Sequence, residues 1–514
     1  MLFNSYLFIL AFLPTALIGF YILANKNHQK LSISWLILSS LLFYSWWNPA
    51  YLWLISFSVL FNFYIGRLLL RDNNFYTLCI GVISNLLLLA YFKYGNFFVD
   101  NINNILSKNI TLDEIILPIA ISFFTFQQIA FLVDTYRGET KRTNFLNYCL
   151  FVTFFPQLIA GPIVHHSEML PQFKDKKFLI FQPSNIVIGI TIFSIGLFKK
   201  SILADGIADY SSPVFEAAEF GNLITFFEAW GGALAYSFQL YFDFSGYSEM
   251  AIGLGRMFGI ILPINFYSPY KANNIIDFWK RWHITLSRFL QKYLYIPLGG
   301  NRKGTSRRYI NLLITMFLGG LWHGAGWNFL IWGAIHGFYL VINHSWRYLY
   351  SISIIKSLNI TRIGIIFSRA ITFLAIVFAW VIFRSETLEG AIIFYRGMLG
   401  LNGFSLPIQM ADQTHYLDLL FPFIQIDANG LGSFGSPLGF IWLGILLWIV
   451  WFTPNTIELI NDNKFNKKDF RIMASARNRY YWSPTKIWAF LSAFMAVISI
   501  LSLNEVSEFL YFQF

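Results

Sequence analysis

The chain has 514 residues, of which 56% are hydrophobic, 20% aromatic and only 12% charged, and its mean hydropathy is +0.55. Soluble domains carry about 25% charged residues, so this composition excludes a soluble enzyme, a disordered scaffold and a DNA-binding factor. Apolar stretches of about 20 residues recur along the chain, and each can cross a bilayer core as a helix. They are continuous rather than alternating, which disfavours a β-barrel. We therefore predict an all-α, polytopic integral membrane protein.

In chain order, the predicted spans are 3–24, 31–47, 50–66, 75–99, 114–133, 145–165, 184–204, 222–242, 245–262, 309–323, 327–343, 364–383, 437–453 and 486–503. The first has no basic leader and no small-residue cleavage site, so we interpret it as a membrane helix rather than a signal peptide. Pro156 and Gly161 interrupt a later span, which predicts half-helices or re-entrant segments. Residues 1–503 are expected to form one transmembrane domain, and 504–514 a short tail.

Basic residues predict how the chain is oriented. The first connection contains Lys26 and Lys30 and the third contains Arg67 and Arg71, whereas the connection between them carries no basic residue. Because basic connections stay in the cytoplasm, the N-terminus is predicted to lie outside it. The 454–486 connection is also strongly basic, so the last span is expected to deliver the C-terminal tail to the outer side.

Positive charge is concentrated between Lys271 and Arg308, where nine Lys and Arg residues accompany a single acid, Asp277. Apolar residues recur at helical spacing over 276–293, which predicts an amphipathic helix on anionic lipid headgroups. A second interpretation is a cytoplasmic docking surface for an anionic acyl donor, and the two are compatible. The candidate donor contacts are Lys280, Arg281, Arg288 and Arg302. Because the patch lies among membrane spans, nucleic acid is not an expected partner.

His323 is the main candidate for chemistry. It lies in a glycine-rich run at 319–328 with an apolar segment on either side. An ionisable group at membrane depth costs about 2–3 kcal/mol or more and normally faces a cavity or pathway. A neutral histidine there can take a proton from an attacking hydroxyl, which is the work of a general base. The alternative, a hydrogen-bonded histidine with a packing role, stays open at this point.

Other polar residues give weaker signals. His283 lies at the edge of the predicted amphipathic helix, where a structural role is the default. Asp243 is a carboxylate in an apolar run, and pairing with a nearby Arg or Tyr is the simplest expectation. His165 and His166 fall in an interfacial connection, and His336 is expected to pack against neighbouring helices. Known metal-ligand spacings such as His-Glu-x-x-His and Cys-x-x-Cys do not occur, so no metal site is predicted.

Several motifs in the middle of the chain carry a family resemblance. They are Tyr241–Ser248 (YFDFSGYS), Phe278–Ser287 (FWKRWHITLS), Tyr295–Arg302 (YIPLGGNR) and Gly320–Gly324 (GLWHG). Their order and spacing resemble the membrane-bound O-acyltransferase (MBOAT) family, above all its bacterial alginate O-acetyltransferase-like branch. The 154–162 segment (FFPQLIAGP) fits the same family. The resemblance implies a ring of transmembrane helices, some of them re-entrant, around a central channel.

The resemblance also implies roles for individual residues. In that family, the histidine matching His323 is the essential catalytic residue, and the position matching His283 is the second polar residue of the site. The chain ends as Phe-x-Tyr-x-x-Phe, and a similar terminal motif in the family implies that Tyr511 acts as an acyl relay. An aromatic anchor at the outer interface is the alternative interpretation of this tail.

Together these observations predict an acyltransferase of the bacterial cytoplasmic membrane. It would pass an acyl group, with acetyl the expected one, from acetyl-CoA or a carrier-protein thioester across the bilayer. An extracytoplasmic serine-hydrolase-like partner would then O-acetylate a polysaccharide such as alginate. No bound cofactor is implied. Transfer of D-alanyl or another acyl group, and a transporter without transfer chemistry, remain the alternatives.

Overall fold

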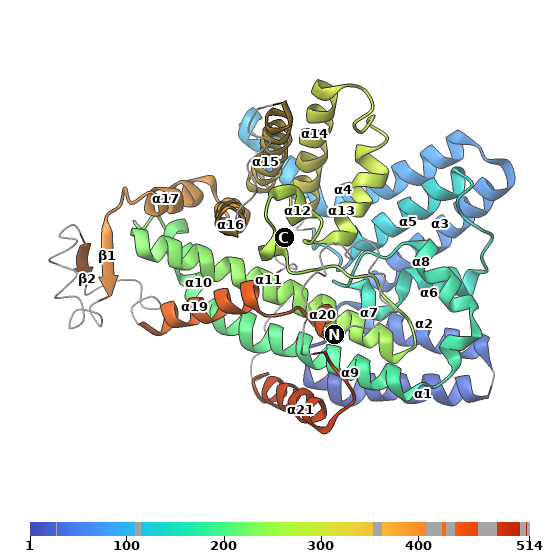
Figure 1. The fold of residues 1–514 in the computed structure, drawn as a ribbon. Coiled ribbons are helices and arrows are strands. Elements are labelled where there is room, and N and C mark those ends of the chain that lie inside the picture. The colour runs from blue at the N-terminus through green and yellow to red at the C-terminus, as the bar shows by residue number, and fades with distance from the viewer. Residues whose placement is uncertain are drawn as a thin grey trace. The chain divides into compact units, whose positions relative to one another are not determined.

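The computed structural model describes residues 1–26, 28–107, 110, 115–352, 362–407, 424–427, 437–460, 481–503 and 510. The chain forms two compact units, whose helices and strands are labelled in Figure 1. The first comprises Met1–Phe198, Phe244–Asn265 and Thr456–Gln513, and the second comprises Lys199–Asp243 and Phe266–Asn455. The two units interleave along the chain, and the expectation of a single transmembrane domain over residues 1–503 stays a prediction.

The first unit is helical. Its helices are α1 (Leu13–Asn25), α2 (Gln29–Ser45), α3 (Leu52–Asp72), α4 (Phe75–Leu106), α5 (Ile121–Tyr136), α6 (Phe145–Thr153), α7 (Phe155–Leu158), α8 (His166–Lys174), α9 (Pro183–Phe198), α20 (Thr456–Ile460) and α21 (Lys486–Leu501). A π-helical turn, Phe8–Phe12, leads into α1. The end of the chain returns to this unit, because α21 packs along α9.

Buried amides join α3 to α4 inside the first unit. Asn62 Nδ2 donates to Asn85 Oδ1 at 3.1 Å, and Asn85 Nδ2 donates to Asn62 Oδ1 at 2.6 Å. Both side chains are buried in otherwise apolar helices. In such surroundings polar side chains pair across helices because an unsatisfied amide is costly. The reciprocal pair therefore fixes how these two helices meet.

The second unit holds the remaining helices and a small sheet. Its elements are a π-helical segment (Lys199–Ala204), α10 (Asp205–Glu219), the first part of α11 (Phe226–Met257), α12 (Ile275–Trp279), α13 (Ile284–Leu290), a π-helical segment (Gln291–Tyr295), α14 (Thr305–His323), α15 (Trp327–Ile352), α16 (Arg362–Arg384), α17 (Leu388–Met398), β1 (Phe404–Pro407), β2 (Ile424–Asp427) and α19 (Pro437–Phe452). The two strands run parallel, with Phe404 opposite Ile424. This short pair is an addition to the predicted all-α fold, which is otherwise confirmed.

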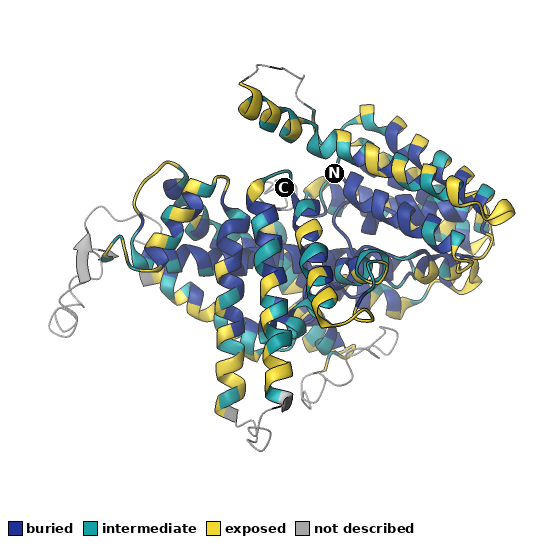
Figure 2. Cartoon of the chain, turned by 90° about the horizontal axis from the view of Figure 1, so that it is seen from above, coloured by how far each residue is buried: buried dark blue, intermediate teal, exposed yellow. Residues whose placement is uncertain are grey.

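Among the described residues, five helical stretches are long and apolar enough to cross a membrane. They are Phe8–Asn25, Pro49–Asp72, Phe75–Leu106, Pro183–Glu219 and Ile363–Arg384. In the most apolar part of Phe75–Leu106 only 17% of residues are buried within the protein, so its apolar surface is left for lipid. Individual helices carry both buried and exposed residues (Figure 2). The protein is therefore a multi-pass membrane protein.

Three predicted spans differ from the observed helices. The spans 222–242 and 245–262 are parts of one helix, α11, because Gly246 lies inside it without breaking it. The 114–133 span begins as a helix only at Ile121, and α5 is buried along almost its whole length. The predicted interruption of 145–165 is confirmed, since α6 ends at Thr153 and the short α7 follows.

Candidate active site

His323 lies at the end of a helical hairpin. It is the last residue of α14, and α15 begins four residues later at Trp327. Gly324 follows in an extended conformation, and a side chain there would collide with the ring of Phe329. A larger residue at this position would therefore require the Phe329 ring to move. His323 is 4% exposed.

The two helices of the hairpin approach each other closely because glycines face each other across it. A Cβ atom added to Gly320 would collide with the carbonyl oxygen of Phe329 and lie 3.0 Å from Cα of Gly333. One added to Gly333 would collide with the carbonyl oxygen of Met316. Figure 1 shows α14 and α15 side by side. The close approach holds His323 against the first turns of α15.

Aromatic rings form the walls around His323. Its ring centroid lies 5.1 Å from Trp322, 5.0 Å from Trp332 and 5.3 Å from Phe383, with interplanar angles of 71°, 85° and 81°. Phe383 comes from α16, which is tied to α15 by the Asn328 side chain, whose Nδ2 donates to the Ser385 carbonyl at 2.6 Å. Three aromatic rings thus enclose the imidazole of His323.

His283 occupies a break in the predicted amphipathic helix. That prediction was wrong in one respect, because 276–293 is not one helix: α12 ends at Trp279, α13 starts at Ile284, and a turn separates them. His283 has φ 41° and ψ 54°, a left-handed conformation that ends a regular helix and that hydrophobic periodicity does not reveal. Its side chain is completely buried, and burial lowers the pKa of this imidazole to about 3.

Trp322 connects the two predicted histidines. The centroid of the His283 ring lies 6.1 Å from that of Trp322, and Trp322 also contacts His323. The ring of Phe266 stacks on His283 from another direction, at 6.4 Å and 29°. The structure thus brings His283 and His323 into one aromatic cluster in the second unit, as expected if they serve one site.

A third histidine, His336, belongs to the same cluster and was not predicted as part of the site. Its centroid lies 4.7 Å from that of Trp332, the ring that also contacts His323, and its side chain is completely buried. Within the part of the chain that the structure describes, neither ring nitrogen of His336 has a hydrogen-bond partner. The spacing of Trp332 and His336, four residues apart on one helix, is the sequence signal that would have placed them together.

A buried ion cluster lies elsewhere in the second unit. Lys200 Nζ lies 2.7 Å from Asp205 Oδ1 and 2.7 Å from Asp243 Oδ1, and the side chains of Lys200 and Asp243 are 2% and 1% exposed. The expectation that Asp243 would be paired holds, but an ion-pair partner is a lysine rather than an Arg or Tyr. The lysine was missed because 43 residues separate the two, so no local pattern joins them. We interpret this cluster as structural, because each buried charge needs a partner of opposite sign to compensate it.

The four predicted donor contacts differ in their availability. Arg281 donates from Nε to Asp277 Oδ1 at 2.9 Å and is partly buried, so part of its charge is already compensated. Lys280 and Arg302 are exposed, and Arg288 is half-buried. The accessible charges for an anionic donor are therefore those of Lys280 and Arg302.

The predicted relay residue, Tyr511, lies outside the described residues, as does the rest of the 504–514 tail apart from Leu510, which is buried. Its acylation stays a prediction.

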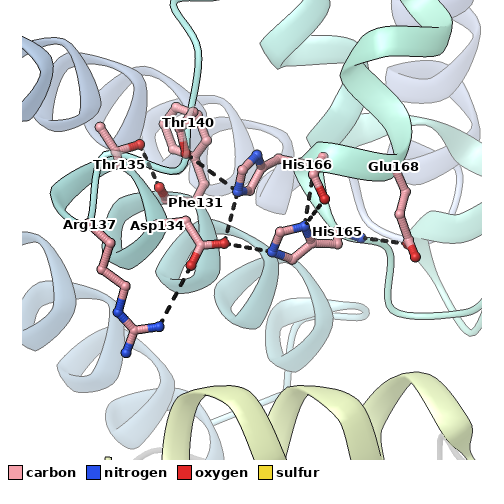
Figure 3. Close-up of polar contacts among 9 residues, drawn as sticks. Phe131, Asp134, Thr135, Arg137, Thr140, His165, His166 and Glu168 are labelled. Atoms are coloured by element: carbon pink, nitrogen blue, oxygen red, sulfur yellow. Dashed lines mark hydrogen bonds and ion pairs between the residues drawn. The ribbon is translucent and has the colours of Figure 1, made fainter.

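A further polar cluster, which the sequence did not predict, lies in the first unit. There the side chains of Asp134, His165 and His166 meet (Figure 3). The sequence predicts only an interfacial connection for the two histidines.

The helices define a multi-pass membrane protein in which buried histidines are walled by aromatic rings. Comparison with known proteins gives the family. The model of MBOAT, the membrane-bound O-acyltransferase family, matches residues 83–383, and the chain belongs to this family. It is therefore an acyltransferase, and a transporter without transfer chemistry is no longer needed to explain the sequence.

Individual relatives cover most of the chain. It is 47% identical over 448 residues to the peptidoglycan O-acetyltransferase of Helicobacter pylori, which covers 81% of this chain and 83% of the relative. It is 40% identical over 416 residues to the probable alginate O-acetylase AlgI of Pseudomonas aeruginosa, covering 79% and 76%. It is 36% identical to the probable alginate O-acetylase AlgI of Azotobacter vinelandii over 534 aligned residues, covering 100% of both chains.

Proposed function

We propose that the protein moves an acetyl group from a cytoplasmic thioester across the membrane for O-acetylation of an envelope polysaccharide. The observation that carries this proposal is the burial of His323 at the α14–α15 turn, where its imidazole is enclosed by aromatic rings. The relatives named for acetyl transfer favour acetyl over D-alanyl. Peptidoglycan is the first candidate acceptor because the relative named for it shares 47% identity, and alginate is the second.

The proposed first step is an acyl transfer onto Tyr511. His323 takes the phenol proton, and the phenolate oxygen attacks the thioester carbonyl. The new oxygen–carbon bond forms, the sulfur–carbon bond breaks, and the proton leaves with the thiol. The acetyl-tyrosine ester is then consumed by an extracytoplasmic partner whose serine carries the group to a sugar hydroxyl.

The role of His323 is tested in cells that lack the chromosomal gene and carry the variant. His323→Ala is expected to abolish O-acetyl groups on the purified polysaccharide, measured by mass spectrometry of its fragments, while the protein level in the membrane stays normal. His28→Ala is the matched control, because His28 is exposed and far along the chain from the motifs. Unchanged acetylation with His323→Ala would overturn the assignment.

The role of His283 is separated from its backbone conformation by His283→Asn. Asparagine tolerates the left-handed region, so this variant keeps the turn between α12 and α13. If the imidazole takes part in transfer, the variant folds normally and loses activity. If His283 only packs, activity is retained at the wild-type level, and the catalytic assignment fails.

The tail is tested by Tyr511→Phe, which removes only the hydroxyl. The relay requires that oxygen, so transfer to the polysaccharide stops and the acetylated tryptic peptide of the tail disappears from the mass spectrum. An aromatic anchor would tolerate the change, since a phenylalanine ring suits the membrane interface equally well.

The donor and the orientation are proposals that rest on charge. Lys280→Ala and Arg302→Ala together are expected to raise KM for acetyl-CoA with kcat nearly unchanged, because they remove a binding contact and not the base. The proposed location is the bacterial cytoplasmic membrane with both termini outside. A single cysteine introduced at each terminus and treated with an impermeant maleimide tests this orientation, and both are expected to be labelled in intact cells. Labelling only after the cells are opened would show that the termini lie in the cytoplasm.

A further inference from the structure

Two adjacent histidines and one aspartate converge on a single point in the first unit (Figure 3). Asp134 lies near the end of α5, and His165 and His166 lie where α8 begins. Nε2 of His165 is 2.7 Å from Asp134 Oδ2, and Nε2 of His166 is 3.0 Å from the same oxygen. One ligand atom from each residue lies within 4.8 Å of the other two. The three side chains thus direct three metal-binding atoms at one small volume.

We propose that Asp134, His165 and His166 form a binding site for a divalent first-row transition metal ion, for which zinc is the natural probe. The site is independent of the proposed acetyl transfer. Two imidazole nitrogens and one carboxylate oxygen are a common zinc donor set, whereas calcium and magnesium prefer oxygen alone. Three protein donors leave a fourth position for water.

The spacing fits a metal ion after a small adjustment. Ligand atoms about 2.0–2.1 Å from a tetrahedral zinc ion lie roughly 3.3 Å apart, so the observed 2.7 and 3.0 Å need to grow by only a few tenths of an ångström. The two imidazole rings already lie close together, with centroids 4.3 Å apart. The three donors therefore start close to the separations that an ion requires.

Burial and charge favour an ion at this place. The Asp134 and His166 side chains are 0% and 3% exposed, and His165, at 24%, leaves a path for an ion to enter. Arg137 is the basic side chain nearest in sequence, but its Nη1 lies 3.9 Å from Asp134 Oδ1. A divalent cation held by Asp134 Oδ2 would add positive charge directly beside this buried carboxylate.

A second layer of contacts can hold His165 in the coordinating form. Its Nδ1 accepts a hydrogen bond from the Ser167 backbone N–H at 3.2 Å and also lies 2.5 Å from the Ser167 hydroxyl. When Nε2 binds a metal ion, the ring proton sits on Nδ1, so the bond from the Ser167 backbone N–H is given up and the Ser167 hydroxyl oxygen can accept the Nδ1 proton instead. Ligating histidines usually use their second nitrogen in this way. An edge-on Phe131 ring, 5.8 Å from His166, supplies an apolar wall.

The test measures metal on the full-length protein purified in detergent with a tag that contains no histidine. After treatment with a chelator and equilibration with micromolar Zn²⁺, we expect about one zinc per chain by mass spectrometry of the metal content. Co²⁺ in place of zinc should give visible absorption bands of four-coordinate geometry. Zinc should also raise the Tm of the chelator-treated protein. None of these readouts depends on enzymatic activity.

Variants identify the ligands. His165→Gln with His166→Gln should lose the stoichiometric zinc and the Tm shift, and Asp134→Asn should bind about tenfold or more weakly. Ser167→Ala should weaken binding about tenfold, as changes in outer contacts of metal sites do. The control His28→Gln, at an exposed histidine, should bind as the wild type does.

Two results would overturn the site. One is a folded, chelator-treated wild-type protein that retains no stoichiometric zinc or cobalt, since the cluster would then be a hydrogen-bonded network alone. The other is equal binding by the wild type and the double histidine variant, because the metal would then be held elsewhere. The first of these results is measured on the wild-type protein alone, so the proposal can be overturned even if the variants fail to fold.

Discussion

The close approach of α14 and α15 makes Gly320 a sensitive position for function. In Gly320→Ala the new methyl group would collide with the Phe329 carbonyl oxygen and lie 3.0 Å from Gly333 Cα. Both are backbone atoms, which cannot rotate away. The helices must therefore separate by roughly 1 Å to restore ordinary contact distances. His323 lies three residues further along the same helix, so its imidazole moves with the backbone.

The expected cost to stability is small and the cost to activity is large. Overpacking costs about 1–3 kcal/mol, and alanine recovers about 1 kcal/mol over glycine within a helix, so the net loss in the free energy of unfolding is about 0–2 kcal/mol. A misplacement of about 1 Å in a catalytic group can lower the rate about 100-fold. Gly320→Ala should therefore insert and fold but transfer acyl groups about 100 times more slowly.

Gly444→Ala provides the control. Gly444 lies in the apolar helix α19, and a Cβ atom there would meet nothing within 4 Å. This variant should keep full activity and gain up to about 1 kcal/mol of stability. Release of thiol from the donor thioester measures activity, and thermal unfolding in detergent measures stability. Wild-type activity in Gly320→Ala, or an equal loss in Gly444→Ala, would refute the reasoning.

Variants at three further places probe buried polar groups. Lys200→Met should lower the free energy of unfolding by about 3–5 kcal/mol, because it leaves Asp243 buried without this partner, and adding Asp243→Asn should restore part of the loss in thermal unfolding. His336→Leu should raise stability by about 1 kcal/mol, since no described residue hydrogen-bonds its ring nitrogens; a lower Tm would reveal a bound partner such as water. Asn62→Leu should cost about 1 kcal/mol, and Asn62→Leu with Asn85→Leu should cost less than the sum of the single changes in a double-mutant cycle.

The helical hairpin that carries His323 could be predicted from local signals. The predicted spans 309–323 and 327–343 end and begin where α14 and α15 do, because the glycines that interrupt the apolar pattern also form the turn. The proline break near Pro156 was visible for the same reason. Each of these features depends on residue types that change the backbone within a few positions.

Features set by distant contacts could not be predicted in this way. The break before α13 depends on the left-handed conformation of His283, which a periodic apolar pattern over 276–293 conceals. The partner of Asp243 lies 43 residues away, and Asp134 lies 31 residues from His165. Spacing within one helix reports which residues share a face, but only packing between helices decides which faces meet.

The aromatic cluster explains how buried histidines are compatible with the proposed chemistry. Indole and phenyl rings surround His323, and in the proposed reaction its imidazole gains a charge only when a hydroxyl gives up a proton. The same walls limit the access of water, which would otherwise compete with the acceptor for the thioester. In the proposed reaction His323 is the base, while His283, whose pKa burial lowers to about 3, stays neutral and is suited to hydrogen bonding rather than to carrying charge.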